Sequence, residues 1–428
     1  MISFLEDART KKASALNKLK HQLSLIDNDL AVLRRRTVDM DDFLFPNGNY
    51  DAQIASLPDS MPPELSTRNQ LIARYRDNVE TAYFQRRSAP DDDYRALEEI
   101  TNMLVDATSV SGVTKRSSIQ HIDILRSNHN LISSIEFNTP ATLFATAGVT
   151  KRIKVFDFNT MLPASETDDL NHHHYPILEI PTVSKLSCLS WSRKQTSILA
   201  ASTYKGDILI HDTETNTQLK ALREHTQRTW YVDFSLLRPT LLLSGSDDRT
   251  VKLWDVDRQS ESVMTLQTKA NVCCVKFNPH ESHEFAFGSA DHNVYSYDLR
   301  HPRTPLCVFE GHWRAVSHVL FMNRSELISA STDSSCKLWN VQKQEPGLSY
   351  AGHTNNRNFV GLSGRGDFFA CGSEDNSLYV YNKRFAGPVV RYGFGSRAEF
   401  VSTVAWKPDS NVLVAANNTG GIEVLEVH

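Results

Sequence analysis

The strongest constraint on this chain is a dipeptide ending that recurs at nearly constant spacing along most of the sequence. Each ending is an aromatic residue, a histidine or a leucine followed by Asp, Asn or Glu, after a short stretch of alternating apolar and polar residues. The seven endings are Phe156-Asp157, His211-Asp212, Trp254-Asp255, Tyr297-Asp298, Trp339-Asn340, Tyr381-Asn382 and Leu425-Glu426. They are separated by 55, 43, 43, 42, 42 and 44 residues. Such a period indicates a repeat protein, whose units bury their apolar faces against one another.

The length of the period indicates the architecture of the repeat. A period of roughly 40 to 45 residues with a Trp-Asp ending is typical of the WD repeat, in which four strands form one blade of a β-propeller. The fuller signature, with a histidine near the start of the unit, occurs at His225, Gly311-His312 and Gly352-His353. Seven endings therefore predict an all-β, seven-bladed WD40 propeller over residues 118–428.

The seventh unit reaches the end of the sequence after its third strand, so its outer strand has to come from elsewhere. The segment 120–125 precedes the first blade and alternates apolar and polar residues. We expect it to pair with the last blade and close the ring, because an unfinished blade would leave an open sheet edge. We also expect the repeated His, Asp and Trp residues to hydrogen-bond within a blade, since catalytic groups would not recur in unit after unit.

The first 37 residues carry a different pattern. Leucine and isoleucine recur at alternating spacings of three and four, at Leu16, Leu19, Leu23, Ile26, Leu30 and Leu33. This is the seam of a left-handed coiled coil, and it predicts a helix that pairs with a partner helix or with a second copy. The alternative is an amphipathic helix packed on its own chain. The seam covers less than three heptads, so the pair needs further contacts to be stable.

The region between the seam and the propeller divides into three parts. Prolines and an Asn-Gly pair break regular structure over 38–66, which predicts a linker. Helical spacing returns over 67–108, which predicts a helical region. The small and polar residues of 109–117 predict a second linker, leading into the propeller.

Composition excludes several classes of protein. The net charge of −4 does not suggest a nucleic-acid binder, because such domains are usually basic. No stretch approaches the length of apolar chain that crosses a bilayer, and the first ten residues are too acidic for a signal peptide. We therefore expect no direct nucleic-acid contact and no membrane. Six cysteines in 428 residues predict a reducing compartment rather than a disulfide framework.

Catalytic and metal-binding motifs are not recognisable in the sequence. We find no G-x-S-x-G, no P-loop and no H-E-x-x-H. Cys273 and Cys274 are neighbours in an expected strand, so their side chains point to opposite faces and fit core packing better than a redox pair. His172, His173 and His174 are consecutive in an insertion, and consecutive residues rarely converge on one ion. We expect no catalytic residue, no metal and no cofactor.

The topology of a blade sorts binding candidates by face. The loop before the innermost strand and the turn between the second and third strands lie at the same end of the ring. Seven residues at such positions are cationic, aromatic or histidine. They are Lys185, Tyr204, Arg228, Trp230, His292, Arg314 and Phe359. A basic and aromatic cluster on an acidic protein predicts a site for an acidic peptide with an apolar anchor. The alternative is a set of loop residues that never converge, since loops are polar in any case.

Six stretches of the repeat region carry a specific signal: FATAGVTKRIKVFDF (144–158), SKLSCLSW (184–191), the SGSDD–VKLW run (244–254), KANVCCVKFNP (269–279), GSADHNVYSYDLR (288–300) and GHTNNRNFVGL (352–362). They resemble the propeller of the constitutive photomorphogenic ubiquitin ligases, a family built from a zinc RING, a coiled coil and a WD40 propeller. The resemblance covers 130–428 densely, and a weaker one covers the predicted coiled coil and the helical stretch around ETAYFQRR. The resemblance implies a substrate receptor that promotes ubiquitin transfer onto proteins such as transcription factors.

The family recognises short Val-Pro motifs preceded by acidic residues, and its peptide-binding positions correspond to the seven residues gathered by the face argument. The resemblance implies that Val-Pro packs on Trp230 and Phe359, with Tyr204 shaping the pocket. Lys185, Arg228 and Arg314 would then meet the acidic residues, with help from His292. Two positions depart from the family pattern. Arg314 stands where Lys is expected, and Asn356 stands where an acid is expected, so preferences at one end of the peptide differ.

The larger departure is the RING, which needs eight Cys or His ligands, whereas the first 187 residues contain no cysteine. We expect either a RING upstream of this sequence or one borrowed through the coiled coil. The related suppressor-of-phytochrome family places the same coiled coil and propeller behind a kinase-like domain, and the sequence does not separate the two families.

Taken with the resemblance, the sequence predicts the substrate-receptor component of an E3 ubiquitin ligase in the nucleus and cytoplasm. The expected partners are transcription factors and receptors that carry acidic Val-Pro motifs, a coiled-coil partner or second copy, and a cullin-type ligase adaptor. The alternative is a non-catalytic WD40 scaffold that assembles partners through its coiled coil and propeller.

Overall fold

The chain consists of two compact units, residues 1–109 and 110–428. The computed structural model describes residues 2–44, scattered helical positions between 70 and 105, and residues 108–120, 130–161, 174–258, 260–395 and 400–428. The insertion predicted around residues 163–176 falls mostly outside the described residues, and its first two histidines, His172 and His173, fall outside them entirely. Among the helices that are described, none is both long and apolar enough to cross a membrane.

The N-terminal unit contains the long helix α1 (Ile2–Leu44). The helix continues past the end predicted at residue 37, because the first helix-breaking residue of the sequence is Pro46. The leucines of the seam are exposed by 41–59%, at Leu16, Leu19, Leu23, Leu30 and Leu33. Asp29, by contrast, is buried and accepts a hydrogen bond from the Tyr83 hydroxyl. These leucines are thus exposed within the described residues, and the pairing of the seam with another helix remains a prediction.

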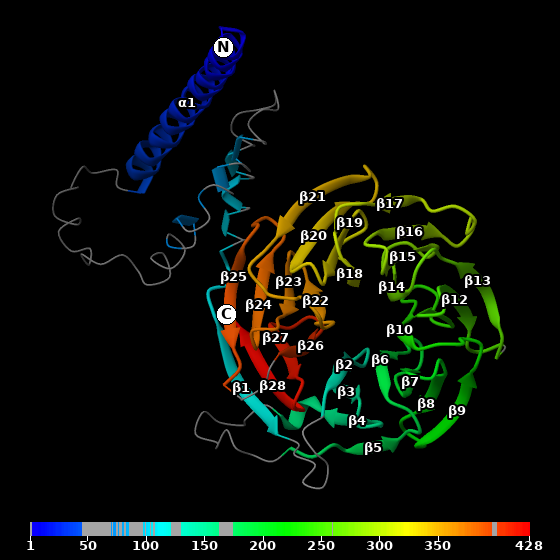
Figure 1. The fold of residues 1–428 in the computed structure, drawn as a ribbon. Helices are drawn as coiled ribbons and strands as arrows, with labels where there is room; N and C mark the ends of the chain where they lie inside the picture. Colours follow the sequence, from blue (N-terminus) through cyan, green and yellow to red (C-terminus); the bar gives the residue numbers. More distant parts are fainter. Residues whose placement is uncertain are drawn as a thin grey trace. The chain divides into compact units, whose positions relative to one another are not determined.

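The C-terminal unit is a ring of seven four-stranded antiparallel sheets, which confirms the predicted propeller (Figure 1). Blade 1 contains β2 (Ile132–Phe137), β3 (Leu143–Gly148), β4 (Arg152–Asp157) and β5 (Leu178–Pro181), with a 3-10 turn at Phe158–Thr160. Blade 2 contains β6 (Leu186–Trp191), β7 (Ile198–Thr203), β8 (Ile208–Asp212) and β9 (Thr217–Leu222). Blade 3 contains β10 (Thr229–Phe234), β11 (Leu241–Ser246), β12 (Thr250–Asp255) and β13 (Ser262–Gln267).

The remaining blades follow in the same order around the ring. Blade 4 contains β14 (Val272–Phe277), β15 (Glu284–Ser289), β16 (Val294–Asp298) and β17 (Cys307–Phe309). Blade 5 contains β18 (Val316–Phe321), β19 (Glu326–Ser331), β20 (Ser335–Asn340) and β21 (Glu345–Tyr350). Blade 6 contains β22 (Leu362–Arg365), β23 (Phe368–Gly372), β24 (Ser377–Asn382) and β25 (Pro388–Gly393). Blade 7 contains β26 (Val401–Trp406), β27 (Val412–Asn417) and β28 (Gly421–Val427).

The fourth strand of blade 7 is β1 (Val113–Gln120), which pairs antiparallel with β28 from Val113↔Val427 to Gln120↔Gly421. The sequence placed the closing strand at 120–125 and a linker at 109–117, and both positions need correction. The strand lies earlier, and 121–125 fall outside the described residues. An outer strand is held by main-chain hydrogen bonds more than by apolar side chains. The polar stretch 113–120 can therefore form this strand, with Ile119 as its buried apolar side chain.

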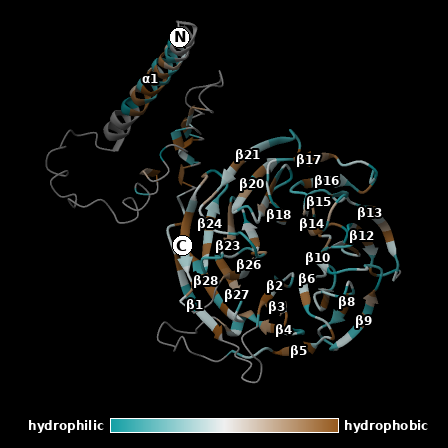
Figure 2. Cartoon of the chain, viewed as in Figure 1, coloured by the Kyte–Doolittle hydropathy of each residue, from teal (hydrophilic) through white to brown (hydrophobic). Residues whose placement is uncertain are grey.

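The core lies between the blades. The inner strands are buried on both faces because each blade is covered by two neighbours, and β6 and β7 are buried at every position. Ile208 and Ile210 of blade 2, for example, share one apolar cluster with Val232 and Phe234 of blade 3. Outer strands face water instead, and β21 is exposed at five of its six positions and mostly hydrophilic in colour (Figure 2).

A buried chain of hydrogen bonds repeats inside blades 3 and 5. In blade 3 the His225 ring hydrogen-bonds to the Asp248 carboxylate and to the Ser244 hydroxyl, both at 2.7 Å. The Trp254 indole N–H donates to the same hydroxyl at 2.8 Å. Blade 5 repeats the arrangement with His312, Asp333, Ser329 and Trp339. These two sets, which we call the blade networks, bear out the hydrogen bonding within a blade that the recurrence of these residues predicts.

Candidate functional site

One backbone hydrogen bond, repeated in every blade, fixes the end of the ring at which the candidate residues lie. In six blades the bond joins the first residue of the turn between the second and third strands to the residue just before the innermost strand, and in blade 6 it joins the second residue of that turn to Thr354, eight residues before β22. The N–H donors and carbonyl acceptors are Val149 to Leu131, Tyr204 to Lys185, Asp247 to Arg228, Ala290 to Asn271, Thr332 to Ala315, Glu374 to Thr354 and Asn418 to Phe400. The two kinds of loop therefore share one end, as the blade topology predicts.

Three aromatic side chains meet at this end. The ring centroid of Trp230 lies 4.8 Å from that of Phe359 and 6.2 Å from that of Tyr204. Trp230 belongs to blade 3, Tyr204 to blade 2, and Phe359 to the loop that leads into blade 6, so blades that are not neighbours contribute to one cluster. All three rings are half-buried and line the mouth of the central cavity.

Trp230 reaches this position because it sits in a β-bulge. The pairing of β10 with β11 shifts register between Thr229 and Tyr231, which leaves Trp230 as the extra residue and re-aims its side chain. The same bulge occurs at the second residue of five other innermost strands, where the residues are Ser133, Ser187, Cys273, Ser317 and Ser402. Of these six bulges, only that of blade 3 carries a large side chain.

Arg228 covers the aromatic cluster. Its guanidinium carbon lies 4.2 Å from the ring centroid of Tyr204 and 4.5 Å from that of Trp230, within the range of a cation–π interaction. Its Nε is buried without a hydrogen-bond partner. No carboxylate of the described residues pairs with this side chain, so its charge is available to an anion. We call Tyr204, Arg228, Trp230 and Phe359 the aromatic notch.

Asp247 and Glu374 hold the notch in place, and sequence reasoning missed both. The Asp247 carboxylate accepts hydrogen bonds from the Trp230 indole N–H at 2.7 Å and from the Asn271 amide at 2.9 Å. The Glu374 carboxylate accepts the backbone N–H groups of residues 356, 357 and 358 at 2.7 to 2.9 Å, just before Phe359. Burial raises the pKa of Glu374, but these donors outweigh it and leave the pKa below its usual value.

The other predicted residues lie around the notch to different degrees. Lys185 is exposed, and its carbonyl accepts the Tyr204 N–H. Arg314 stacks on Trp313 and donates to the Asn356 carbonyl at 2.9 Å, so it supports the loop that carries Phe359. His292 is exposed in the turn between β15 and β16 and has a φ of 77°. No described contact joins His292 to the notch.

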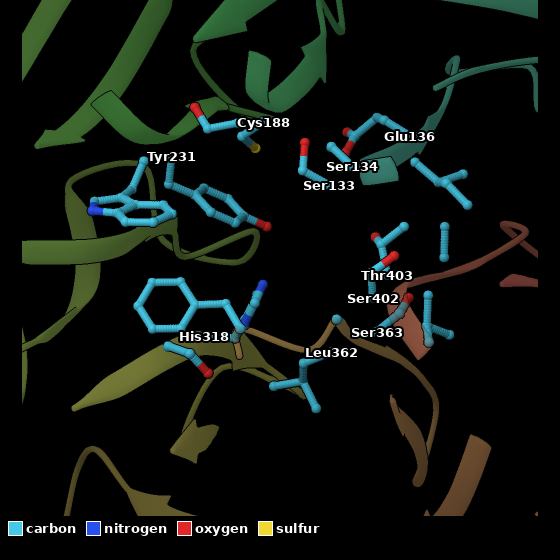
Figure 3. A pocket seen from close by; sticks show the side chains of 18 of the residues that line it. Ser133, Ser134, Glu136, Cys188, Tyr231, His318, Leu362, Ser363, Ser402 and Thr403 are labelled. Atoms are coloured by element: carbon cyan, nitrogen blue, oxygen red, sulfur yellow. The ribbon is translucent and has the colours of Figure 1, made fainter. Parts of the chain in front are cut away.

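The notch opens into a cavity of about 550 Å³ along the ring axis (Figure 3). Its wall mixes apolar side chains with serines from several blades, and Figure 3 shows Tyr231, His318 and Glu136 around it. Two partly buried ion pairs lie at the wall, Lys276 with Asp233 and Arg193 with Glu136. Burial and the charge of Lys276 lower the pKa of His318 to about 4, so the ring is neutral at physiological pH.

The cavity offers no activated nucleophile among the described residues. Burial raises the pKa of the Cys188 and Cys273 thiols to about 12, and both therefore stay protonated and inert near pH 7. The arrangement can instead hold an apolar group between two rings while a guanidinium meets negative charge. That is the chemistry of a binding site.

Comparisons with known proteins agree with this architecture. The family "WD domain, G-beta repeat" matches residues 216–255, 260–298, 303–340 and 344–382. The chain is 44% identical over 339 residues to "E3 ubiquitin-protein ligase COP1" of Arabidopsis thaliana, covering 77% of this chain and 49% of that protein. It is 42% identical over 330 residues to "Protein SUPPRESSOR OF PHYA-105 1" of the same plant, covering 72% and 31%. It is 34% identical over 324 residues to "WD repeat-containing protein RUP2", covering 69% and 87%.

The chain belongs to the COP1/SPA family of WD40-repeat proteins. This confirms the resemblance drawn from the sequence. The chain spans about half the length of the COP1 proteins that it matches. The four repeats matched as a WD domain start in the outer strand of one blade and end in the third strand of the next, from β9 to β24. Blade 1, the first three strands of blade 2 and blade 7 lie outside these matches, yet they complete the ring.

Proposed function

We propose that this chain is the substrate-receptor part of an E3 ubiquitin ligase, and that the aromatic notch binds peptides in which Val-Pro follows acidic residues. The observation that carries the proposal is the notch itself. Trp230 and Phe359 present apolar surface at the mouth of the cavity, and the Arg228 charge beside them has no carboxylate partner among the described residues. An apolar anchor next to an available cation suits a peptide that carries both features.

A Val-Pro pair fits the two rings for reasons of shape and entropy. Proline has a fixed φ and loses almost no side-chain freedom on binding, and valine has few rotamers to lose. Both side chains are compact, so they can lie against Trp230 and Phe359 while Tyr204 forms the third wall. Trp230 is itself held by Asp247, so little ordering of the protein is needed when the peptide binds.

The acidic residues of the peptide would meet Arg228 and Lys185, whose side chains form no ion pair within the described part of the chain. Arg314 stays a predicted contact of the acidic residues, but it also has a second role. Its guanidinium donates to the Asn356 carbonyl, so part of its hydrogen-bonding capacity is already used in shaping the loop. His292 would contact only the far end of a peptide that extends over blade 4.

We propose that the transfer of ubiquitin is carried out by groups outside the propeller. The relatives named E3 ubiquitin-protein ligase support a place in that pathway, and the protonated cysteines of the cavity argue against a thioester step there. A RING outside this sequence, a RING partner bound through α1, or a cullin-type adaptor would supply the transfer. The substrates would be transcription factors or receptors with the peptide motif.

A second candidate function is a scaffold that assembles partners without presenting a substrate. The exposed leucine seam of α1 supports it, because such a seam is a surface for another helix. The similarity to a protein named only as WD repeat-containing, of which the chain covers 87%, supports it as well.

The test of the receptor proposal is a titration of the full chain with labelled peptides. A peptide with three acidic residues before Val-Pro should bind with a Kd near 1 μM, about −8 kcal/mol. A peptide with Ala-Ala in place of Val-Pro, and one with Gln and Asn in place of its acids, should each bind about tenfold more weakly or worse. Equal binding of all three peptides would rule out the proposed recognition.

The scaffold proposal is separated from it by partner capture. A triple variant with Lys185, Arg228 and Trp230 changed to Ala should lose peptide-bearing partners and keep partners of α1. Undiminished capture of every partner by this variant would favour the scaffold.

A further inference from the structure

The boundary between blades 5 and 6 contains a cluster of two cysteines and a histidine that the notch does not use. Cys336 lies on β20, Cys371 on β23, and His353 in the loop before β22. The two Sγ atoms and one ring nitrogen lie within 4.8 Å of one another. Cys336 and Cys371 are 0% exposed and His353 is 3% exposed. Within the described residues, this is the one such group of three possible metal ligands.

The cluster arises from substitutions in the blade network. Cys371 occupies the strand position of Ser244 in blade 3 and Ser329 in blade 5, and Tyr381 occupies the position of Trp254 and Trp339. In the blade networks the serine hydroxyl satisfies both the indole N–H and the histidine ring. In blade 6 the Tyr381 hydroxyl lies 2.9 Å from His353 Nδ1 instead. The other ring nitrogen, Nε2, lies 4.0 Å from the Cys336 sulfur.

This arrangement is compatible with the form of His353 that a metal requires. A neutral imidazole has one N–H and one free lone pair, and a hydrogen bond from Nδ1–H to the Tyr381 oxygen leaves the Nε2 lone pair facing the sulfurs. The same role is played in metal sites by the groups that orient a ligating histidine. Thiolate is the form in which cysteine binds metals.

We propose that Cys336, His353 and Cys371 bind one thiophilic metal ion, Zn²⁺ or Cu⁺, between blades 5 and 6. Two thiolates and one imidazole with no carboxylate make a soft donor set, which selects these ions over Mg²⁺, Ca²⁺ or Mn²⁺. Zn²⁺ would complete its usual four ligands with a water, whereas Cu⁺ accepts a set dominated by thiolates. The atoms are close enough that small rotations would bring them to the bond lengths of about 2.0 to 2.3 Å that zinc shows.

The position of the site gives it a structural consequence. Cys336 belongs to blade 5 and Cys371 to blade 6, so one ion would join two blades whose strands share no sheet. His353 also begins the loop 353–359, which ends at Phe359 of the notch. The metal would therefore fix both ends of this loop region, together with Glu374, which already holds residues 356–358.

The experiment measures metal in the full chain. Because the site is buried, the ion has to enter during folding, so the protein is expressed in medium supplemented with zinc or, in a second arm, with copper. The purified chain is kept under reducing conditions and its metal content is determined by elemental mass spectrometry. Wild type should carry about one ion per chain in at least one arm, and the arm identifies the ion.

Two variants make the result specific. Cys371→Ser should lose the ion and still fold, because serine stands at the equivalent position in blades 3 and 5. Cys307→Ser removes a buried cysteine of blade 4 outside the cluster and should keep the ion. Folding of each is checked by circular dichroism and a thermal scan. A folded wild type with no more metal than Cys371→Ser in either arm would overturn the proposal.

The rival outcome is a disulfide between Cys336 and Cys371. Intact mass spectrometry of protein purified without reductant would show it as the loss of two hydrogens, with no such loss in Cys371→Ser. A metal-free wild type carrying that bond under reducing purification would also contradict the metal site.

Discussion

The blade 3 network and the aromatic notch use the same kinds of residue with opposite results. In the network, His225, Ser244 and Trp254 satisfy one another's hydrogen bonds and are buried. Asp247, the neighbour of Asp248 in the network, accepts a hydrogen bond from Trp230 instead. The Trp230 ring stays half-exposed beside Arg228, which has no carboxylate partner among the described residues. The network recurs in blade 5, whereas a large side chain at the bulge, Trp230, occurs in blade 3 alone among the six described bulges. Polar groups whose hydrogen bonds are all satisfied within the protein stabilise the fold, whereas groups with unused hydrogen-bonding or charge-pairing capacity are available to a ligand.

The largest expected effect comes from removing the network carboxylate. Asp248→Ala leaves the buried His225 ring and the Thr250 hydroxyl without their partner. We expect the free energy of unfolding to fall by about 3 kcal/mol, measured by chemical denaturation, while the folded fraction keeps its peptide affinity. Asp257→Ala, which removes an exposed ion pair with Lys194, is the control and should cost less than about 1 kcal/mol. A loss of peptide affinity in folded Asp248→Ala would erase the distinction between network and notch.

The reverse pattern is expected for Trp230→Ala. Its peptide affinity should fall by at least about 2 kcal/mol, or roughly thirtyfold, because the ring forms one wall of the apolar anchor site. The unfolding midpoint should change little, since the ring is only half-buried. Calorimetric titration measures the first quantity and a thermal scan the second. Tyr175→Ala, which removes an aromatic residue that is 73% exposed before β5, should bind the peptide as the wild type does. Unchanged affinity in Trp230→Ala would remove the notch as the binding site.

Acid should weaken the blade 3 network. Burial raises the pKa of Asp248, but hydrogen bonds involving His225 and Thr250 lower it to about 2, below its ordinary value. A carboxyl with a depressed folded-state pKa stabilises the protein fully above its unfolded pKa near 4, and this stabilisation is lost as the pH falls towards 2. We expect Asp248 alone to contribute about 2 kcal/mol across that window. Asp248→Asn should flatten the fall of stability between pH 4 and 2, and an unchanged slope would contradict the assignment.

The smallest effect is expected from Asp247→Ala, the neighbour of the network residue. The indole of Trp230 and the amide of Asn271 lose their acceptor, but both can reach water at the end of the ring. Peptide affinity should fall by about 1 kcal/mol, with stability nearly unchanged. Asp247→Asn retains an acceptor and should recover most of the affinity. A loss of stability comparable to that of Asp248→Ala would show that both aspartates stabilise the fold in the same way.

The ring was predictable from the sequence because the constraint is repeated. Each blade ends its third strand at the same kind of residue, and seven repetitions outweigh the irregularity of any single unit. The closing strand was misplaced because its pairing is made by the backbone, so residues 113–120 need no distinctive side chains. The length of α1 was underestimated because the apolar seam ends before the helix does.

The site was only partly predictable. Blade topology gives the end of the ring on which a residue lies, and this suffices to gather Tyr204, Arg228 and Trp230. It does not give the distance around the ring, which is why His292 was included although no described contact joins it to the others. Asp247 and Glu374 were missed because their role depends on which backbone groups they face. The cysteines of the blade 5–6 cluster were missed because their residues are brought together by tertiary packing alone.

The pairing of β1 with β28, which closes the ring, has a consequence for how the protein is synthesised. Roughly 300 residues lie between the end of β1 and the start of its partner. At about 5 to 20 residues per second, the ribosome needs roughly 15 to 60 s to cover that distance. During that interval β1 has no partner to complete its sheet, and the ring can shut only after β28 has left the ribosome.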